Sequence, residues 1–148
     1  MPTDRDQIER LVYGYAERID AGDFEGVADL LADATLTSEG SDLRVIGRDQ
    51  VLDLYTHTTR RYPNGTPNSR HVTTNLVIEF AEADRATARS YFTVLQAVPG
   101  QLALQPIIAG GYRDHFERVD DRWRFSARHI TVDLVGELGH HLLFELEL

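Results

Sequence analysis

The spacing of apolar residues changes once along this chain, from helical to strand-like, at about residue 70. Before that point apolar side chains recur three and four positions apart, which is the period of one helix face. After it, β-branched and aromatic residues gather in four runs separated by short turns. The runs span residues 70–80, 86–98, 102–119 and 123–135. Helices first and consecutive strands afterwards predict an α+β domain, with helices packed on one face of an antiparallel sheet.

Three helices are predicted in the first 60 residues. The first ends before Gly22 and presents a single apolar stripe. That stripe consists of Ile8, Leu11, Val12, Tyr15, Ala16 and Ile19. Asp23 can cap a second helix over 24–31, and a third helix is expected over 48–59. A short strand and a turn are expected between the second and third helices.

The chain has 148 residues, enough for one domain with a sizeable core, and we expect a single domain over 1–148. The tail from Gly136 is apolar for a chain end. We therefore predict that residues 136–148 fold back over the domain or cross into a neighbouring subunit. Together with the long apolar strands, this tail favours a homo-oligomer, either a trimer or a dimer.

The charge balance is acidic, with 24 Asp and Glu against 15 basic residues, all of them arginine, and a formal net charge of −9. Phosphate binding needs a concentrated basic face, so this balance argues against a nucleic-acid partner. No run approaches the roughly 18 apolar residues of a membrane span, and the N-terminus lacks the apolar region of a secretion signal. Because cysteine is absent as well, we expect a cytoplasmic protein without membrane association.

Asp20 and His71 are the residues that most favour an enzyme. Asp20 ends the first helix, where a carboxylate opposes the helix dipole. His71 begins the first long strand run, and an imidazole held by a carboxylate is a general base suited to neutral pH. Strict alternation places His71 on the face opposite Leu76 and Ile78, so either the pocket face is polar or a bulge switches the parity. The alternative is a half-buried structural histidine and a surface carboxylate.

Two further residues have competing interpretations. Tyr15 lies on the apolar stripe and is either a core aromatic or a proton donor. Arg128 alternates with Arg124 in the last strand run, so it is either a surface arginine or a group that stabilises negative charge on a substrate. Histidines and carboxylates show no spacing typical of a metal site, so no metal is predicted. Gly110–Gly111, within a strand run, predicts a bulge.

Three stretches of the sequence have the order and the residue motifs of one superfamily. They are the helix Ile8–Asp23, the run Arg70-His71-Val72-Thr73-Thr74-Asn75-Leu76, and the run Gly110–Arg118 followed by Asp121–Arg128. These stretches resemble the SnoaL-like branch of the nuclear transport factor 2-like superfamily, over nearly the whole chain. The resemblance implies a cone-like curved antiparallel sheet with three N-terminal helices packed on its concave face.

Among members with assigned chemistry, the stretches are most similar to hexachlorocyclohexane dehydrochlorinase and bile acid 7α-dehydratase, with scytalone dehydratase more distant. The resemblance implies a dyad in which His71 removes a proton and Asp20 holds the imidazole. It maps a tyrosine of the bile acid enzyme onto Tyr15 and a strand arginine of the dehydrochlorinase onto Arg128. The dehydrochlorinase has a lysine where Tyr15 stands. Scytalone dehydratase has a second histidine where this chain reads Val94-Leu95-Gln96.

We therefore predict a cofactor-free lyase or isomerase, dehydratase-like or cyclase-like, that acts on a small hydrophobic cyclic molecule. The residues expected to line the substrate cavity are Phe24, Leu52, Tyr55, Phe92 and Ile107. The main alternative is a non-catalytic ligand-binding module, or a small β-type subunit of a ring-hydroxylating dioxygenase. A further option is a ketosteroid-isomerase-type mechanism, with the strand carboxylate Asp114 as the base.

Overall fold

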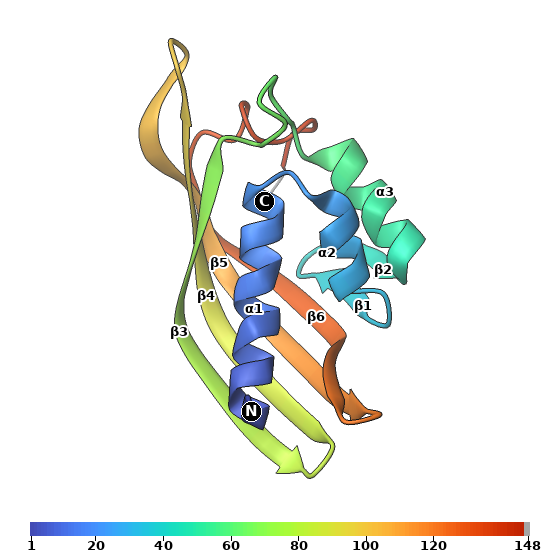
Figure 1. Cartoon of the computed structure of the whole chain (residues 1–148). Coiled ribbons are helices and arrows are strands. Elements are labelled where there is room, and N and C mark those ends of the chain that lie inside the picture. The colour runs from blue at the N-terminus through green and yellow to red at the C-terminus, as the bar shows by residue number, and fades with distance from the viewer. Residues whose placement is uncertain (147–148) are drawn as a thin grey trace.

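The computed structural model describes residues 1–146 of the chain. Its elements follow the predicted order (Figure 1), and the α+β class is confirmed. They are α1 (Asp4–Asp20), α2 (Phe24–Leu30), β1 (Thr35–Ser38), β2 (Arg44–Ile46), α3 (Arg48–Thr58), β3 (Ser69–Glu82), β4 (Arg85–Val98), β5 (Leu102–Val119) and β6 (Arg122–Val135). Within these residues, no helix is long and apolar enough to cross a membrane.

Capping residues and one glycine set the ends of the first two helices. Thr3 and Asp6 form a reciprocal capping box at the start of α1, and the Asp23 side chain accepts a hydrogen bond from the first turn of α2. Gly22, between the helices, has a φ of 74°, and a Cβ there would lie 1.9 Å from the carbonyl oxygen of Gly65. This close approach sets the end of α1 against the loop that precedes β3.

The six strands form one curved, open sheet in the order β2-β1-β6-β5-β4-β3. Strands β3 to β6 are consecutive antiparallel neighbours, as predicted. Strand β1 differs, because it runs parallel to β6 with Leu36 opposite Arg128. The sheet is therefore mixed rather than purely antiparallel. Short hairpins impose antiparallel pairing on consecutive strands, whereas β1 and β6 are joined through the rest of the domain and either direction is open to them.

Helix α1 lies along the concave face of the sheet, and α2 and α3 pack against each other beyond it (Figure 1). The core fills the space between α1 and the sheet. Five of the six residues in the predicted stripe of α1 are buried: Ile8, Val12, Tyr15, Ala16 and Ile19. The arrangement leaves the C-terminal end of α1, with Asp20, beside the first residues of β3.

A β-bulge in β3 settles the parity of His71. The pairing register with β4 slips around Asn75, whose φ is 54°. Before the bulge the half-buried positions include His71 and Thr73, and after it the inward positions are Leu76 and Ile78. Of the two predicted explanations, the bulge is therefore the one that applies. Asparagine is among the residues that accept a left-handed backbone most readily.

A second bulge lies opposite the predicted glycine pair, on β6, where Asp133 is the extra residue. The register with β6 slips between Ala109 and Gly110. A Cβ on Gly110 would lie 2.0 Å from the carbonyl oxygen of Thr131 and 2.9 Å from the ring of Phe92. Glycine is needed here because the neighbouring strand and the Phe92 ring leave no room for a side chain.

Residues 136–146, which we call the strap, fold back over the connection between α3 and β3. Three backbone contacts hold it: a bridge between Thr59 and Leu142, a 2.8 Å hydrogen bond from the N–H of Arg60 to the carbonyl of His141, and a 3.0 Å bond from the N–H of Leu143 to the carbonyl of Thr58. This part of the predicted tail packs on its own chain. The last two residues of the predicted 136–148 segment lie outside the described residues.

Candidate active site

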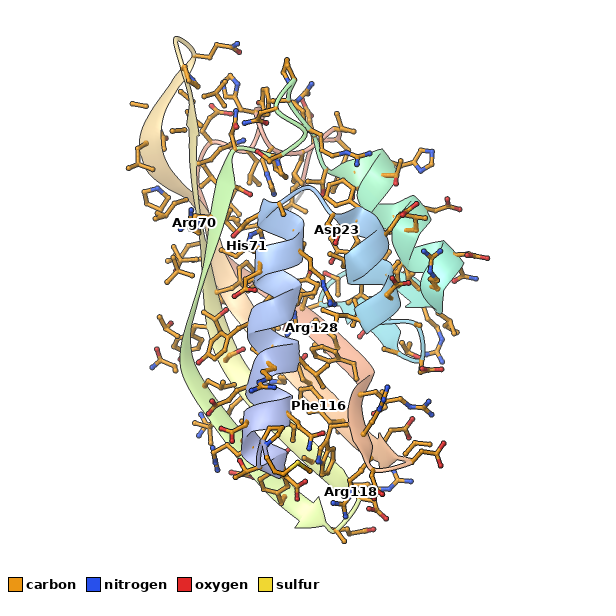
Figure 2. The ribbon with its side chains drawn as sticks, viewed as in Figure 1. Asp23, Arg70, His71, Phe116, Arg118 and Arg128 are labelled. Atoms are coloured by element: carbon orange, nitrogen blue, oxygen red, sulfur yellow. The ribbon has the colours of Figure 1, made fainter. Side chains whose placement is uncertain are left out.

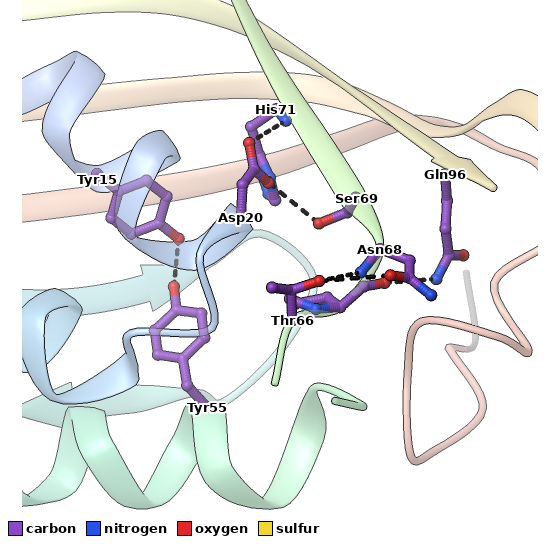
Figure 3. A network of polar contacts seen from close by, with 9 residues as sticks. Tyr15, Asp20, Tyr55, Thr66, Asn68, Ser69, His71 and Gln96 are labelled. Atoms are coloured by element: carbon purple, nitrogen blue, oxygen red, sulfur yellow. Dashed lines mark hydrogen bonds and ion pairs between the residues drawn. The ribbon is translucent and has the colours of Figure 1, made fainter. Parts of the chain in front are cut away.

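The fold brings Asp20 and His71 into direct contact, from the end of α1 and the start of β3. The Nδ1 atom of His71 lies 2.6 Å from Oδ1 of Asp20, and the backbone N–H of His71 donates to Oδ2 at 2.7 Å (Figure 3). The hydroxyl of Ser69 donates a third hydrogen bond to Oδ1 at 3.0 Å. These three donors hold the carboxylate in one orientation and offset its unfavourable place at the negative end of α1.

The contact with Asp20 defines which nitrogen of His71 is free. A carboxylate only accepts hydrogen bonds, so Nδ1 is the nitrogen that donates to Asp20, and in the neutral tautomer that fits this contact Nε2 has the lone pair. Nε2 has no hydrogen-bond partner among residues 1–146. The two side chains are 9% and 12% exposed, and Figure 2 shows His71 beside the end of α1. The arrangement can therefore take a proton from a molecule bound next to His71.

The cavity next to His71 is mainly apolar and has a volume of about 200 Å³. Its walls come from α1, α3, strands β3 to β6 and the strap. In the described part of the chain, no Asp, Glu, Lys or Arg side chain lines it. Such a cavity suits a small, uncharged and largely apolar molecule. Residues 1–146 also contain no cluster of three or more His, Asp or Glu side chains that could hold a metal ion.

Two of the five predicted cavity residues, Tyr55 and Phe92, line this cavity. Phe24 does not, because it is a core residue packed against Tyr55 with ring centroids 6.0 Å apart. Leu52 lies on a different side of α3, where it lines a separate polar groove near Arg61. Phe24 and Leu52 therefore lie outside this cavity, in contrast to the expected lining.

Ile108 occupies the place predicted for Ile107. Ile107 is fully buried in the core, whereas Ile108 lines the cavity. The register of β5 with β4 slips at this point, with Val94 opposite Ile108 and Leu95 opposite Pro106. The extra residue shifts the alternation by one position, which a prediction from regular alternation does not include.

Tyr15 and Tyr55 join their hydroxyl groups in a hydrogen bond at the wall of the cavity (Figure 3). Burial raises the pKa of Tyr15, and burial together with the neighbouring Tyr15 raises the pKa of Tyr55 well above its ordinary value. Both phenols therefore stay protonated at neutral pH. Two hydroxyls that share one hydrogen bond have one O–H left to donate to a ligand. Tyr15 is thus a buried aromatic that keeps the capacity to donate.

Arg128 is fully buried, and it does not line the cavity. Its guanidinium makes two hydrogen bonds to Asp114, at 2.8 and 2.9 Å, and lies 3.8 Å from the ring centroid of Tyr112 and 4.2 Å from that of Tyr15. Burial alone would lower the pKa of Arg128, but the Asp114 carboxylate outweighs it and the net shift is upward. Arg128 is neither a surface arginine nor placed to touch a substrate. Its guanidinium packs against the rings of Tyr15 and Tyr112 in cation–π contacts.

The ion pair with Arg128 also decides whether Asp114 can act as a catalytic base. Both carboxylate oxygens of Asp114 accept from Arg128, and the side chain has no exposed surface. Because a base needs a free oxygen facing the substrate, the ketosteroid-isomerase-type option does not fit this geometry.

His141 is the residue of this site that the sequence reasoning missed. It lies in the strap, is 7% exposed, and lines the same cavity as His71, with ring centroids 6.4 Å apart. Burial, and then the neighbouring His71, lowers the pKa of His141 to about 4. The available signal was a pair of histidines inside an unusually apolar tail, but nothing local indicates which element the tail meets.

Known proteins share this arrangement of elements. The sequence profile of the SnoaL-like domain matches residues 2–129. Among solved structures, hexachlorocyclohexane dehydrochlorinase LinA-type3 from Novosphingobium barchaimii LL02 is 26% identical, with a TM-score of 0.71 and coverage of 91% of this chain and 90% of that one. A protein of unknown function from Mycobacterium tuberculosis is also 26% identical, with a TM-score of 0.69 and coverage of 87% and 71%.

A third solved structure supports the fold alone. It is an NTF2-like protein with a cystatin-like fold from Novosphingobium aromaticivorans, 23% identical, with a TM-score of 0.72 and coverage of 87% of this chain and 81% of that chain. No match was found among curated proteins.

Proposed function

Because the chain belongs to the SnoaL-like family of the nuclear transport factor 2-like superfamily, we propose that it is a cofactor-free lyase or isomerase. Its substrate is a small, uncharged, mainly apolar ring compound. The observation that carries the proposal is the 2.6 Å contact between Asp20 and His71, with His71 lining an apolar cavity. The name of the similar dehydrochlorinase supports elimination as the reaction class.

The first step is the removal of a proton by His71. A C–H bond next to a ring carbonyl breaks, the proton passes to Nε2 of His71, and the electron pair moves onto the carbonyl oxygen. Asp20 holds the ring and stabilises the imidazolium that forms, as the orienting carboxylate of a catalytic triad does. The hydroxyl that Tyr15 and Tyr55 leave free donates to the developing enolate oxygen.

The second step decides between elimination and isomerisation. In elimination the enolate re-forms the carbonyl, a carbon–carbon double bond forms, and the bond to a leaving group on the β-carbon breaks. A leaving hydroxide takes the proton from His71 and departs as water, which restores the neutral imidazole. In isomerisation the ring already has a carbon–carbon double bond next to the position that loses the proton, so a dienolate forms, and the same proton returns to its far carbon as the carbonyl re-forms. Both outcomes begin with the same abstraction, so one assay tests them together.

The test is proton exchange in deuterated water, followed by NMR, with cyclohexanone and 3-hydroxycyclohexanone as probes. We expect the wild type to exchange the protons next to the carbonyl faster than buffer, and His71→Ala to lose about 10²–10⁴ of that rate. Elimination from the hydroxy ketone is read as cyclohexenone. The matched control is His57→Ala, because His57 is an exposed histidine of α3 outside the cavity.

Two results would contradict the proposal. One is exchange by His71→Ala at the wild-type rate, which would remove the dyad from the mechanism. The other is wild-type exchange no faster than buffer with both ketones, which would favour the non-catalytic ligand-binding module instead.

A further inference from the structure

The strap holds His141 at the wall of the cavity. Besides the backbone contacts described above, two side chains grip the carbonyl oxygen of the preceding residue, His140. The Tyr62 hydroxyl donates to it, and so does the amide of Gln96, at 3.0 Å. Gln96 is 1% exposed and belongs to β4, so the strap is tied directly to the central sheet. The position of the His141 side chain is therefore defined by the fold.

The imidazole of His141 lacks a polar partner of its own. Its Nδ1 atom is buried and has no hydrogen-bond partner among the described residues. A buried polar atom normally has a partner, because leaving it unpaired costs stability. Here the unpaired nitrogen belongs to a side chain that lines an otherwise apolar cavity beside His71. This combination indicates that the missing partner is a bound molecule.

The charge state of His141 narrows the chemistry of that molecule. With its pKa lowered to about 4 by burial and by His71, the ring is neutral at physiological pH. A neutral imidazole offers one donor and one acceptor, and a hydroxyl group is a neutral partner that can use either. Since no charged side chain lines the described part of the cavity, an anionic substituent would find no counter-charge there.

We propose that His141 binds the β-hydroxyl of a hydroxy ketone and selects such rings over unsubstituted ketones. The inference rests on the proposed lyase function. It assigns two oxygens to the substrate, a carbonyl at the Tyr15–Tyr55 pair and a hydroxyl at His141. When the C–O bond breaks, the hydroxide keeps the electron pair and receives its proton from His71. His141 makes hydrogen bonds only and gains or loses no proton.

The experiment compares three variants on the same two ketones. His141→Leu removes both hydrogen-bonding groups, His141→Gln keeps a donor and an acceptor, and His140→Leu is the matched control on the strap. We expect His141→Leu to lower kcat/KM for 3-hydroxycyclohexanone about tenfold, the size of one lost hydrogen bond, and to change that for cyclohexanone less than twofold. His141→Gln should restore most of the loss, and His140→Leu should leave the ratio between the ketones unchanged.

A second readout does not depend on turnover. In ¹⁵N-histidine-labelled wild type and His71→Ala, 3-hydroxycyclohexanone should shift the ring nitrogen resonances of His141, and cyclohexanone should not. If His141→Leu lowers the rates with both ketones equally, or if the hydroxy ketone causes no such shift, the inference is wrong. If the wild type exchanges neither ketone but the shift is present, the lyase proposal fails and hydroxyl binding by His141 stands.

Discussion

Two pairs, each made of a carboxylate and a basic side chain, lie on the concave side of the same sheet. Asp20–His71 joins the end of α1 to the edge strand β3, and His71 lines the cavity. Asp114–Arg128 joins the neighbouring central strands β5 and β6, and both side chains are completely buried. Each pair has a short contact, 2.6 Å in the first and 2.8 Å in the second. They differ in what remains unpaired and where that group points.

This difference separates an ion pair that stabilises the fold from a pair that can react with a ligand. In the buried pair both carboxylate oxygens are used, and the guanidinium is enclosed by the rings of Tyr15, Tyr112 and Phe125. The Nη1 atom of Arg128 lacks a hydrogen-bond partner among residues 1–146, but it is buried and Arg128 does not line the cavity. In the other pair, three donors fix the carboxylate, while Nε2 of His71 has no partner among residues 1–146 and His71 is one of the residues that line the cavity. We therefore expect the first pair to determine stability and the second to determine activity.

The largest expected effect is on stability, from breaking the buried pair. Arg128→Met leaves the Asp114 carboxylate buried without a partner, which should lower the free energy of unfolding by about 3–5 kcal/mol. Urea unfolding followed by circular dichroism measures this. The double variant Asp114→Leu/Arg128→Met should recover part of the loss, because it removes the stranded charge. A loss below about 1 kcal/mol in Arg128→Met would contradict the claim that the Asp114–Arg128 pair determines stability.

The second prediction concerns the Asp20–His71 pair, where we expect a large effect on activity and a small effect on stability. Asp20→Asn frees Nδ1 of His71 from its fixed proton position and should lower the exchange rate by about 10²–10⁴. The free energy of unfolding should change by only about 1 kcal/mol, because the amide still occupies the site. Residues that act as a unit are not additive, so Asp20→Asn/His71→Ala should be no slower than His71→Ala. A double variant that is much slower would contradict the dyad.

A third prediction concerns pH and His141. The pKa of this residue is about 4 in the folded protein and 6.5 as its ordinary value, so the unfolded chain binds more protons between these values. Stability due to neutral His141 is fully present above pH 6.5 and is lost as the pH falls towards 4. The groups that face it are His71, Asp20 and the phenols of Tyr15 and Tyr55, which line the same cavity or shift its pKa.

The measurement is urea unfolding at pH 7 and at about pH 4.5, in the wild type and in His141→Gln. We expect the wild type to lose about 2 kcal/mol more than the variant over this interval. Equal losses in the two proteins would mean that His141 titrates as it does in the unfolded chain, and would place its ring in contact with water.

The smallest expected effect comes from Ser69. Ser69→Ala removes one of three hydrogen bonds to Asp20 and leaves the other two, so the exchange rate should fall by less than about tenfold. Proton exchange with cyclohexanone measures this against the wild type. A loss approaching that of Asp20→Asn would mean that the hydroxyl, and not the carboxylate alone, holds the imidazole.

Local patterns were sufficient to predict most of the fold. Periods of 3.6 and 2 residues depend on neighbouring positions, and so do the caps at Thr3 and Asp23. The parallel pairing of β1 with β6 was not predictable in this way, because it joins segments about ninety residues apart. The predicted homo-oligomer stays a prediction. Its interface would have to cover exposed apolar strand residues such as Tyr91 and Leu134.

In the candidate site, even more depends on contacts between distant residues, which local patterns do not predict. Asp20 and His71 were candidates from their residue types and positions, but periodicity alone gave no reason for them to meet, and the family resemblance made that contact the favoured interpretation. Arg128 was placed on the correct strand, but its burial depends on Asp114, which stands opposite it on β5. His141 was missed because its role depends on where the strap folds. Each of these outcomes rests on a contact between distant residues, which one-dimensional patterns do not encode.

The bulge at Asn75 has a consequence for how this site is inherited. Strand β3 consists of two halves of opposite phase, joined by one extra residue. Substitutions leave that phase unchanged, whereas the loss of a single codon there would reverse it and turn Val72 inward in place of His71. Such a descendant would keep the fold and the histidine yet have no base in its cavity. The number of residues between His71 and Ile78 is thus a better marker of a working site than the presence of the histidine itself.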